Sequence, residues 1–414
     1  MRRLVVLLLI GAVVAAGEVI VAARVTRPLP APEVRLNVPG SLVLAAGTPP
    51  APPHPATGSL YVASDASGEL AAYDADTQRP IASVAKTMTA LVVLRMHPIA
   101  AGAEGPLLTL TEADVASYQQ AIANQGSAVA VTSGEQLSER QLLLALLLPS
   151  ANNIADTLAR WVAGSVPAFT VMENAEAVAL GMTRTHFDDA SGVSTQTVST
   201  ARDLVSLARA ALGIPALSGI VATRTAALPD GTQLRNLDIE LGSDADWVGL
   251  KTGWTPAAGG CLLFAARHSY ASGVQPVTVY GAVLAQGQDA STDPDHPELG
   301  AAFASARAAV AAATAGYAAV QLASLHPNVT GAVSEPWGAS SPVIVLSALG
   351  VVVARLGASV QLSVVPARPA VAPARGSTVG FLAAHLDGAT VAVWPLESAQ
   401  SIGGPGFWWR LWRA

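Results

Sequence analysis

Lysine is nearly absent from this chain. Its 414 residues include 23 lysines and arginines, of which only Lys86 and Lys251 are lysine. An arginine side chain stays charged, whereas a lysine amine can lose its proton when it is buried or crowded by another cation. The composition is rich in alanine, glycine and proline, and drift in a GC-rich genome explains the scarcity of lysine. It does not explain where lysine survives, so both positions are candidates for acid–base chemistry.

Charge, cysteine and clustered histidine are also scarce. Only 13% of the residues are charged and the net charge is −6, so the composition gives no reason to expect nucleic-acid binding. The single cysteine, Cys261, excludes an intrachain disulfide, and we expect it to fill space in the interior. The seven histidines show no H-E-x-x-H motif and no clustered spacing, and His186 is expected to pack beneath helices. We therefore expect no metal and no cofactor.

The N-terminus carries an export signal. Arg2 and Arg3 precede an apolar run, Leu4–Ala23, which is interrupted at Glu18. The run is about as long as a bilayer-spanning helix, which takes roughly 20 residues. Two interpretations stay open: a retained membrane anchor, or a signal peptide cleaved after Ala23. Both place the remainder of the chain at the outer face of the cytoplasmic membrane or in the cell wall.

Composition divides the chain into five segments. Prolines crowd between Arg27 and Thr57, which predicts an extended, stiff spacer. Beyond Leu322, short β-branched runs between glycines and prolines predict a small all-β domain. The tryptophans and arginines of the last residues favour a membrane contact, and the alternative is that they cap the β domain. The predicted boundaries are 1–27 for a signal peptide or anchor, 28–57 for a Pro-rich linker, 58–322 for the principal domain, 323–404 for the β-rich domain and 405–414 for an aromatic and basic tail.

The principal domain is predicted to be α+β. A hairpin pattern opens it at residues 58–73. The helical patterns that follow cover Glu139–Leu148, Asn153–Trp161, Phe169–Leu180 and Thr200–Leu212, and strand patterns return at Trp247–Lys251, Cys261–Ala266 and Val277–Leu284. The alanine-rich residues Gly300–Leu322 predict a further long helix. One antiparallel sheet with a helical insertion accounts for this order of elements.

The run Ser83-Val84-Ala85-Lys86 supplies a nucleophile and a base three residues apart. If a helix begins at Ser83, both side chains lie on one face of it. A serine hydroxyl is a weak nucleophile without a base, and a neutral lysine amine would serve as that base. Burial and a second cation, Lys251, would lower the pKa of Lys86 from its ordinary value of about 10.4. By itself, however, S-x-x-K arises by chance in many helices.

Two further motifs accompany this one. Ser150-Ala151-Asn152 follows an apolar helix; Ser150 could relay a proton and Asn152 could bind a substrate amide, although alone this run reads as an ordinary helix cap. Lys251-Thr252-Gly253 follows an extended run, where a cation and a hydroxyl can hold a carboxylate and glycine allows a substrate backbone to approach. The backbone N–H groups of Ser83 and Trp254 could form an oxyanion hole.

Together the three motifs are far more specific than each alone, and such a set is typical of penicillin-binding proteins and class A β-lactamases. The chain resembles the low-molecular-weight penicillin-binding proteins, the serine-type D-alanyl-D-alanine carboxypeptidases of peptidase family S11, and is most similar to their actinobacterial members. The resemblance extends from about Gly58 to Leu322. It rests on residues 80–90, 146–155, 180–183, 185–187, 190–192, 199–204 and 249–255.

The resemblance implies a penicillin-binding/β-lactamase-like transpeptidase fold and a DD-peptidase catalytic domain at residues 58–322. It implies that Ser83 is acylated by substrate, that Lys86 is the base and that Ser150 supports proton transfer. The implied substrate-binding residues are Asn152, Lys251, Thr252, Gly253 and Trp254. The implied substrate is the D-Ala-D-Ala end of a peptidoglycan stem peptide, from which hydrolysis removes one D-alanine. β-Lactam antibiotics would acylate the same serine.

Two departures and two alternatives accompany the resemblance. Many family members have threonine where this chain has Ala85, and we expect little effect on catalysis. Some relatives place an arginine beyond the third motif; Arg267 is a weak candidate and is expected at the surface. A class A β-lactamase would need an E-x-x-L-N pattern between Asn152 and Lys251, and Glu173-Asn174 has another spacing. A non-catalytic wall-binding scaffold would not need the intact motifs.

Overall fold

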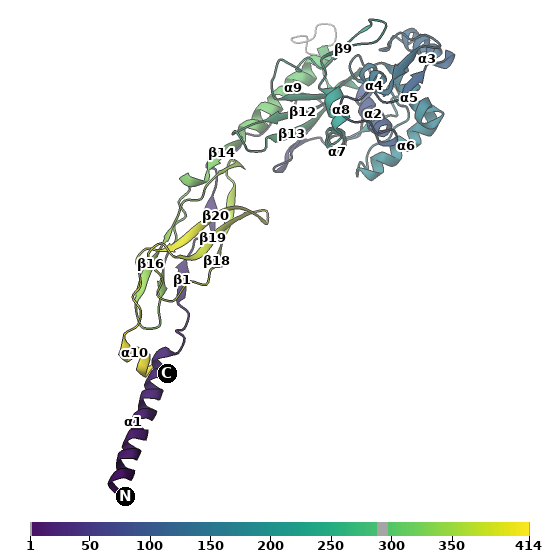
Figure 1. Ribbon diagram of the computed structural model, residues 1–414. Coiled ribbons are helices and arrows are strands. Elements are labelled where there is room, and N and C mark those ends of the chain that lie inside the picture. Colours follow the sequence, from purple (N-terminus) through teal and green to yellow (C-terminus); the bar gives the residue numbers. More distant parts are fainter. Residues whose placement is uncertain (1, 288–296, 414) are drawn as a thin grey trace. The chain divides into compact units, whose positions relative to one another are not determined.

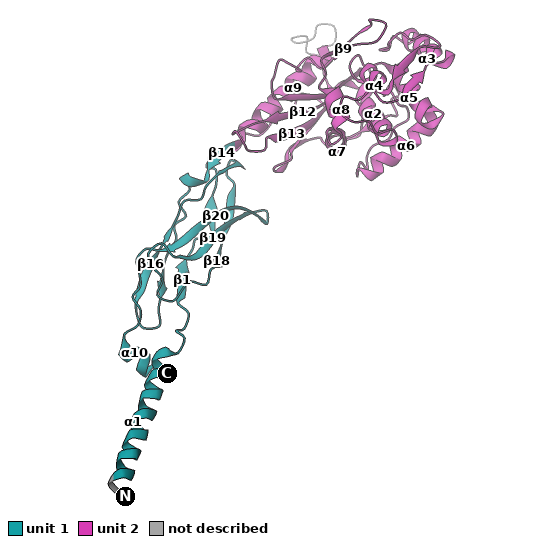
Figure 2. Ribbon diagram, in the orientation of Figure 1, with its two compact units in different colours: residues 1–48, 318–414 teal, residues 49–317 magenta. Residues whose placement is uncertain are grey.

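The structure is a computed structural model that describes residues 2–287 and 297–413 (Figure 1). It contains two compact units, which Figure 2 draws in different colours. One runs from Pro49 to Tyr317, and we call it the sheet–helix unit. The other combines Met1–Thr48 with Ala318–Ala414, and we call it the β unit. The second junction therefore lies at Tyr317, before the boundary predicted at Leu322.

A five-stranded antiparallel sheet forms the centre of the sheet–helix unit. Its strand order is β11–β12–β13–β3–β4, so β11, which carries Lys251, lies at an edge. The strands are β3 (Ser59–Ser64), β4 (Gly68–Tyr73), β11 (Trp247–Thr255), β12 (Gly259–His268) and β13 (Val277–Gln286). Helical segments fill the chain between β4 and β11 (Figure 1). The predicted α+β architecture, one antiparallel sheet with a helical insertion, is confirmed.

Helices cover both faces of this sheet. Strand side chains alternate between faces, so Leu262 and Phe264 join one apolar cluster while Leu263 and Ala265 join the other. The first cluster is closed by α9 (Pro297–Ala315), and the second includes residues of α2 (Lys86–Met96) and α7 (Ala201–Leu212). Burial on both faces explains why β12 reads as a continuous apolar run in the sequence.

Several helices of this unit begin at side-chain caps. Ser138 and Gln141 form a capping box at the start of α4, Ser165 caps α6 and Thr200 caps α7. The helices not yet given are η1 (Ala82–Ala85), α3 (Glu112–Ala123), α4 (Glu139–Leu147), α5 (Asn152–Ala163), α6 (Val166–Ala179) and α8 (Pro215–Val221). Short strands pair as β5 (Arg79–Pro80) with β8 (Val198–Ser199), β6 (Leu107–Thr109) with β7 (Gln136–Ser138) and β9 (Thr225–Ala227) with β10 (Gln233–Arg235).

The β unit contains a seven-stranded sheet in the order β1–β15–β16–β20–β19–β18–β2 and a separate β14–β17 pair. The strands are β1 (Glu33–Asn37), β2 (Ser41–Val43), β14 (Tyr317–Gln321), β15 (Thr330–Ser334), β16 (Ser340–Val345), β17 (Val351–Arg355), β18 (Ser359–Pro366), β19 (Thr378–Leu386) and β20 (Ala389–Ser398). The 3-10 turn η2 (Leu322–Ser324) follows β14. The apolar core of the β unit is built around the fully buried Trp394. Two helices belong to this unit, α1 (Arg2–Thr26) and α10 (Phe407–Trp412).

Two sequence predictions need correction. The helix predicted to reach Leu322 ends at Ala315, because Gly316 stops it and the chain continues as β14. The spacer predicted at 28–57 is not free along its length, since β1 pairs with β15 and β2 pairs with β18. Proline patterns marked extended backbone correctly but gave no sign of its strand partners, which lie some three hundred residues further along the chain.

Candidate active site

Ser83 and Lys86 lie at the junction between η1 and α2. Ser83 is in the 3-10 turn and Lys86 is the first residue of α2, so the spacing of three places both side chains together. Lys86 Nζ lies 2.8 Å from Ser83 Oγ. Ala82, which precedes the serine, has a φ of +45°, a left-handed conformation that non-glycine residues adopt rarely. Such backbone is typical of functional turns, where surrounding structure holds it in place.

The Lys86 amine contacts three oxygen atoms. Besides Ser83 Oγ, they are Asn152 Oδ1 at 2.7 Å and the Ser191 carbonyl oxygen at 2.8 Å. The carbonyl oxygens of Asn152 and Ser191 can only accept hydrogen bonds. A neutral amine has two N–H groups and one lone pair, so it can donate to both carbonyls and still accept from the Ser83 hydroxyl. This arrangement suits a base that removes the serine proton.

The surroundings of Lys86 favour that neutral form. Burial is the main cause that holds its pKa well below the ordinary lysine value, and the positive charge of Lys251 lowers the pKa further. Asp189 and Asp156 act in the opposite direction. Lys86 is fully buried, and the sequence-based expectation that burial and Lys251 lower its pKa agrees with this environment.

Ser150 and Asn152 belong to the junction of α4 and α5. Asn152 is the first residue of α5 and, as described, contacts Lys86 through its Oδ1. Ser150 is 3% exposed and has a φ of +66°. Its hydroxyl makes no hydrogen bond to any residue within the described ranges. Asn152 thus contacts Lys86 directly. Ser150, two residues earlier in the chain, is a buried hydroxyl on strained backbone.

The third motif lies on edge strand β11, against the nucleophile turn. A Cβ atom added at Gly253 would lie 3.0 Å from the backbone nitrogens of Ser83 and Val84 and from the Ile81 oxygen, so only glycine allows this close packing. Lys251 is buried and donates to the Thr252 carbonyl oxygen at 2.9 Å.

Burial lowers the pKa of Lys251 to about 7, while the carboxylate of Asp238 opposes the shift. Lys251 Nζ also lies 3.5 Å from Thr252 Oγ1. Trp254 is half-buried, pairs with Gly260 on β12 and packs against the apolar cluster beneath α9. The strand therefore places an amine and a hydroxyl side by side near the serine, at the edge of the sheet.

Residues 190–192 carry part of the family resemblance, but the sequence assigned no role to the Ser191 carbonyl, which completes the environment of Lys86. The Ser191 carbonyl is a main-chain group, so no side-chain pattern marks it. The loop is shaped by Asp189, which accepts hydrogen bonds from the Ser191 hydroxyl and the Val193 amide. Gly192 has a φ of +81°, and a Cβ there would lie 1.9 Å from the Ala82 oxygen. Glycine thus lets this loop pack directly on the nucleophile turn.

Other residues weighed from the sequence take no part in the contacts around Lys86. Cys261 is fully buried and burial raises its pKa to about 12, which confirms it as an interior filler. Arg267 is exposed, as expected. The expectation for His186 is wrong: it is exposed, because residues 186 and 198 form an isolated β-bridge outside the helices. Within residues 2–287 and 297–413, no group of three or more His, Cys, Asp or Glu side chains could hold a metal ion.

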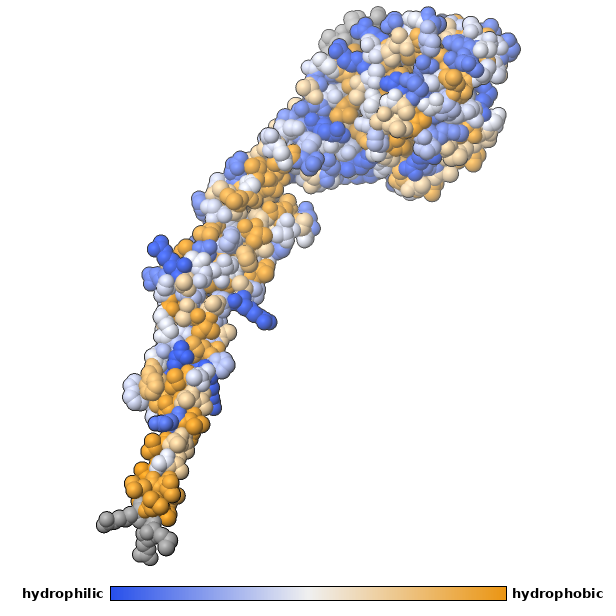
Figure 3. All heavy atoms as spheres, in the orientation of Figure 1, coloured by the Kyte–Doolittle hydropathy of each residue, from blue (hydrophilic) through white to orange (hydrophobic). Residues whose placement is uncertain are grey.

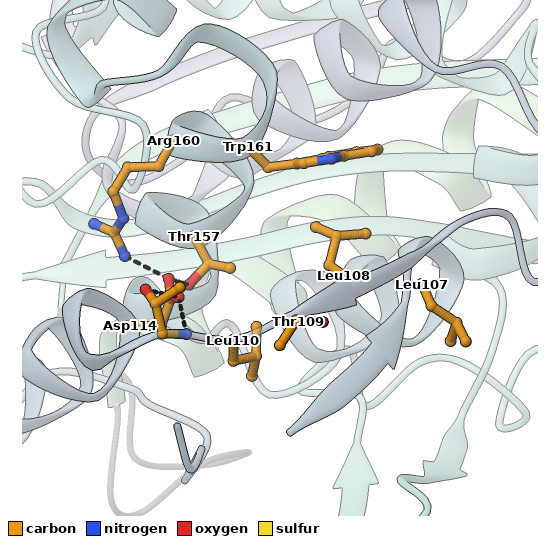
Figure 4. A pocket seen from close by; sticks show the side chains of 9 residues that line it. Leu107, Leu108, Thr109, Leu110, Asp114, Thr157, Arg160 and Trp161 are labelled. Atoms are coloured by element: carbon orange, nitrogen blue, oxygen red, sulfur yellow. Dashed lines mark hydrogen bonds and ion pairs between the residues drawn. The ribbon is translucent and has the colours of Figure 1, made fainter. Parts of the chain in front are cut away.

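A cavity of about 370 Å³ lies beside the later turns of α5 (Figure 4). Arg160 and Thr157 of α5 both donate to Asp114 of α3, each at 2.7 Å, and Figure 4 shows this cluster beside Trp161. These polar groups join α3 to α5. Because α5 begins at Asn152, these hydrogen bonds between α3 and α5 help to hold Asn152 in place beside Lys86. None of the motif residues lines this cavity.

Comparison with known proteins places this site in a family. The D-alanyl-D-alanine carboxypeptidase family model matches residues 47–279, more than half of the chain. The D-alanyl-D-alanine carboxypeptidase DacB2 of Mycobacterium tuberculosis is 36% identical over 222 residues, which cover 52% of this chain and 72% of that protein. The D-alanyl-D-alanine endopeptidase of Escherichia coli is 34% identical over 226 residues, which cover 53% of this chain and 70% of that protein.

Solved structures agree with these sequence matches. The crystal structure of the Streptomyces K15 DD-transpeptidase is similar with a TM-score of 0.54 and 29% identity, covering 64% of this chain and 98% of that one. The predicted penicillin-binding type of fold is thereby confirmed. The strained serine turn, the buried lysine pair and the antiparallel sheet occur in a chain that belongs to the D-alanyl-D-alanine carboxypeptidase family of serine peptidases, peptidase family S11.

Proposed function

We propose that this chain removes the terminal D-alanine from peptidoglycan stem pentapeptides through an acyl-enzyme on Ser83, and that β-lactams acylate the same serine. The observation that carries the proposal is the environment of the Lys86 amine. Its Nζ lies 2.7 Å and 2.8 Å from two carbonyl oxygens and 2.8 Å from Ser83 Oγ, so a neutral amine can donate to both carbonyls and accept from the serine hydroxyl. All three motifs lie within Pro49–Tyr317. We therefore propose this unit as the DD-peptidase catalytic domain.

Acylation follows from this arrangement. Lys86 takes the hydroxyl proton as Ser83 Oγ attacks the carbonyl carbon of the penultimate D-alanine. The backbone N–H groups of Ser83 and Trp254 stabilise the oxyanion. The C–N bond then breaks, and the departing amine of the terminal D-alanine receives a proton that Ser150 relays from Lys86. Water later attacks the ester carbonyl carbon while Lys86 takes its proton. The bond from that carbon to Ser83 Oγ then breaks, the shortened peptide leaves as an acid, and Lys86 returns the proton to Ser83.

Substrate binding uses the other motif residues. Lys251 and Thr252 hold the terminal carboxylate, and Gly253 allows the substrate backbone to lie along β11. Asn152 binds a substrate amide through its Nδ2 while its Oδ1 remains on Lys86. Because a carboxylate favours the charged form of a nearby amine, bound substrate raises the pKa of Lys251 above its value of about 7 in the free enzyme. Substrate binding thus secures the cation that keeps Lys86 neutral.

The acyl acceptor separates the related activities. The names of the relatives include a carboxypeptidase, an endopeptidase and a transpeptidase. The proposed reaction uses water as acceptor and a free D-Ala-D-Ala end as donor. A β-lactamase is a weaker candidate, because Glu173 lies on α6 and contacts Thr89, behind Lys86 on α2. Rapid nitrocefin turnover would favour the β-lactamase, and a folded protein that binds no penicillin would favour a wall-binding scaffold.

The test is D-alanine release from a pentapeptide that ends in D-Ala-D-Ala. Ser83→Ala should abolish release, whereas Ser67→Ala, a matched change at an exposed serine, should leave it intact. A cross-linked peptide in the same assay reports endopeptidase activity. Release by Ser83→Ala at the wild-type rate would refute the proposal.

We also propose that the chain remains attached to the membrane through α1. Residues Leu4–Thr26 of this helix have a mean hydropathy of 2.8 and could span a bilayer, and Figure 3 shows the apolar surface of the helix. Its outer end is joined to α10: Arg24 donates to the Leu411 carbonyl at 3.2 Å, and Arg413 donates to the Arg27 carbonyl at 2.6 Å. These contacts involve residues beyond Ala23, so the proposal of retention rests on the length and hydropathy of the helix.

The α10 helix supplies a second contact with the membrane surface. Phe407, Trp408 and Trp412 are each more than half exposed, and aromatic side chains favour the interface between lipid and water. Intact mass of the purified membrane fraction tests retention, since cleavage after Ala23 would remove that segment. Trp408→Ala with Trp412→Ala should weaken vesicle binding by the full chain; unchanged binding would remove α10 from the proposal.

A further inference from the structure

Glu173 is a carboxyl group buried behind the catalytic lysine, and it forms no ion pair with a cation among residues 2–287 and 297–413. It lies on α6 and is 0% exposed. Its Oε1 atom lies 2.9 Å from Thr89 Oγ1, and its Oε2 atom makes no hydrogen bond to a residue in the described ranges. Burial raises the pKa of Glu173 well above its ordinary value, so the neutral acid is favoured.

The hydrogen-bonding geometry at Thr89 independently favours a proton on Glu173. Thr89 Oγ1 lies 2.6 Å from the Ala190 carbonyl oxygen as well as 2.9 Å from Glu173 Oε1. The carbonyl oxygen can only accept, and the hydroxyl has a single hydrogen. If Thr89 donates to Ala190, the contact with Glu173 is favourable only when Glu173 is the donor. An ionised Glu173 would leave one of these two buried contacts as a repulsion between lone pairs.

This pair supports the peptide that contacts the catalytic amine. Thr89 lies one turn beyond Lys86 on α2. It holds the Ala190 carbonyl, and the next carbonyl, that of Ser191, accepts from Lys86 Nζ at 2.8 Å. A shift of the loop would therefore move one of the two acceptors that orient the amine toward Ser83.

We propose that Glu173 is a positioning residue: as a neutral acid it donates to Thr89, and thereby fixes the loop carbonyl that orients Lys86 for acylation. This inference rests on the proposed role of Lys86 as the base. It assigns to Glu173 no contact with substrate. It also explains why a carboxyl group is tolerated in an interior position, since it acts there as a hydrogen-bond donor rather than as an anion.

The charged groups on the neighbouring elements are consistent with a neutral Glu173. The nearest carboxylate that acts on it is Asp189 of the loop, which raises its pKa further. The other titratable groups on the packed helices are Lys86 and Arg95 on α2, Asp156 and Arg160 on α5 and Glu176 on α6, and the segment after α6 adds Arg184, His186 and Asp188. Arg160 is paired with Asp114. Arg95 is paired with Glu176 at 3.0 Å, so that cation is already engaged. Ionisation of Glu173 would place a second anion near Asp189.

Two substitutions of similar size separate the donor role from simple packing. Glu173→Gln keeps a donor, because the amide N–H can replace the acid O–H. Glu173→Met fills similar space without a donor. We expect acylation by saturating benzylpenicillin to be within about threefold of wild type for glutamine and at least about tenfold slower for methionine, with thermal midpoints confirming that both fold. Thr89→Val should slow acylation similarly, and its combination with Glu173→Met should add little.

Infrared spectroscopy gives a readout independent of acylation. The difference spectrum between wild type and Glu173→Gln should contain the C=O stretch of a protonated carboxylic acid at neutral pH, where ordinary carboxyl groups are ionised. A carboxylate band instead would overturn the inference, as would wild-type acylation by folded Glu173→Met. Equal slowing by glutamine and methionine would also overturn it. If the wild type is not acylated at all, the proposed function fails, while the infrared result still decides the protonation of Glu173.

Discussion

Replacing Lys251 by glutamine should shift the pH dependence of acylation, because the charge of Lys251 helps to keep Lys86 neutral. Burial is the larger cause of the lowered pKa of Lys86, and the Lys251 ammonium is the next. Both side chains are buried, so solvent ions screen one from the other only weakly. Glutamine removes the charge and keeps a polar side chain. We expect the pKa of Lys86 to rise and to remain below its ordinary value, since burial remains.

The size of the shift follows from the charges around the amine. A charge within about 4–6 Å moves a pKa by roughly 1–3 units. Asp189 and Asp156 already offset part of the effect of Lys251, so we expect the lower end, about one unit. One unit corresponds to about 1.4 kcal/mol, and it reduces the neutral fraction of Lys86 about tenfold at pH values below its pKa.

The sign of the effect is defined by the role of Lys86. It accepts the Ser83 proton only as a free amine, so acylation declines as the pH falls through its pKa. A raised pKa moves this acid limb to higher pH. The assay is the rate constant for acylation by a saturating β-lactam across pH, which separates the chemical step from weaker binding. Lys251→Arg keeps a cation and is the control, with its limb near the wild-type position. A glutamine variant whose acid limb coincides with wild type, or lies lower, would refute the coupling between the two lysines.

Three further substitutions test other parts of the structure. Burial raises the pKa of Glu139 to about 7, so its native state holds a proton that the unfolded state loses from about pH 4.5 upward, and stability falls as pH rises between these values. Glu139→Gln should therefore gain about 1–2 kcal/mol over wild type in urea titrations at about pH 8 and little at about pH 4; equal stability at both would contradict this. Gly253→Ala would place a methyl group 3.0 Å from the Ser83 nitrogen, so acylation should slow about tenfold or more in stopped-flow measurements, and a wild-type rate would show that β11 can move away. Gly192→Ala would bring Cβ to 1.9 Å from the Ala82 oxygen, so the free energy of unfolding should fall by more than about 2 kcal/mol, and an equally stable variant would contradict the packing of this loop.

The sequence was most informative where chemistry and periodicity coincide. The two lysines are buried as expected, and the strands from Trp247 to Gln286 form adjacent members of one sheet. Ser83 and Lys86 meet because their spacing matches a helical turn, whichever residue begins the helix. These features depend on local spacing, which a sequence displays directly.

Features that depend on distant backbone were missed for a physical reason. Lys86 contacts the backbone carbonyl of Ser191, and every residue type carries the same backbone carbonyl. Its role is therefore set by the path of the loop and not by a side chain. In the sequence, Glu173 was considered only against the E-x-x-L-N pattern, whose spacing it does not match. Its contact with Thr89 could not be predicted, because Thr89 lies on another helix. The strand at Glu33–Asn37 was read as a spacer, since its alternation is short and its partner, Thr330–Ser334, lies near the other end of the chain.

Peptide mapping of the benzylpenicillin adduct by mass spectrometry tests the central claim most directly, because that claim assigns the nucleophile and its base to two named atoms. The account predicts one adduct, on Ser83, that forms at least about a hundredfold more slowly in Lys86→Gln. An adduct on another residue, or unchanged acylation of Ser83 in that variant, would contradict it.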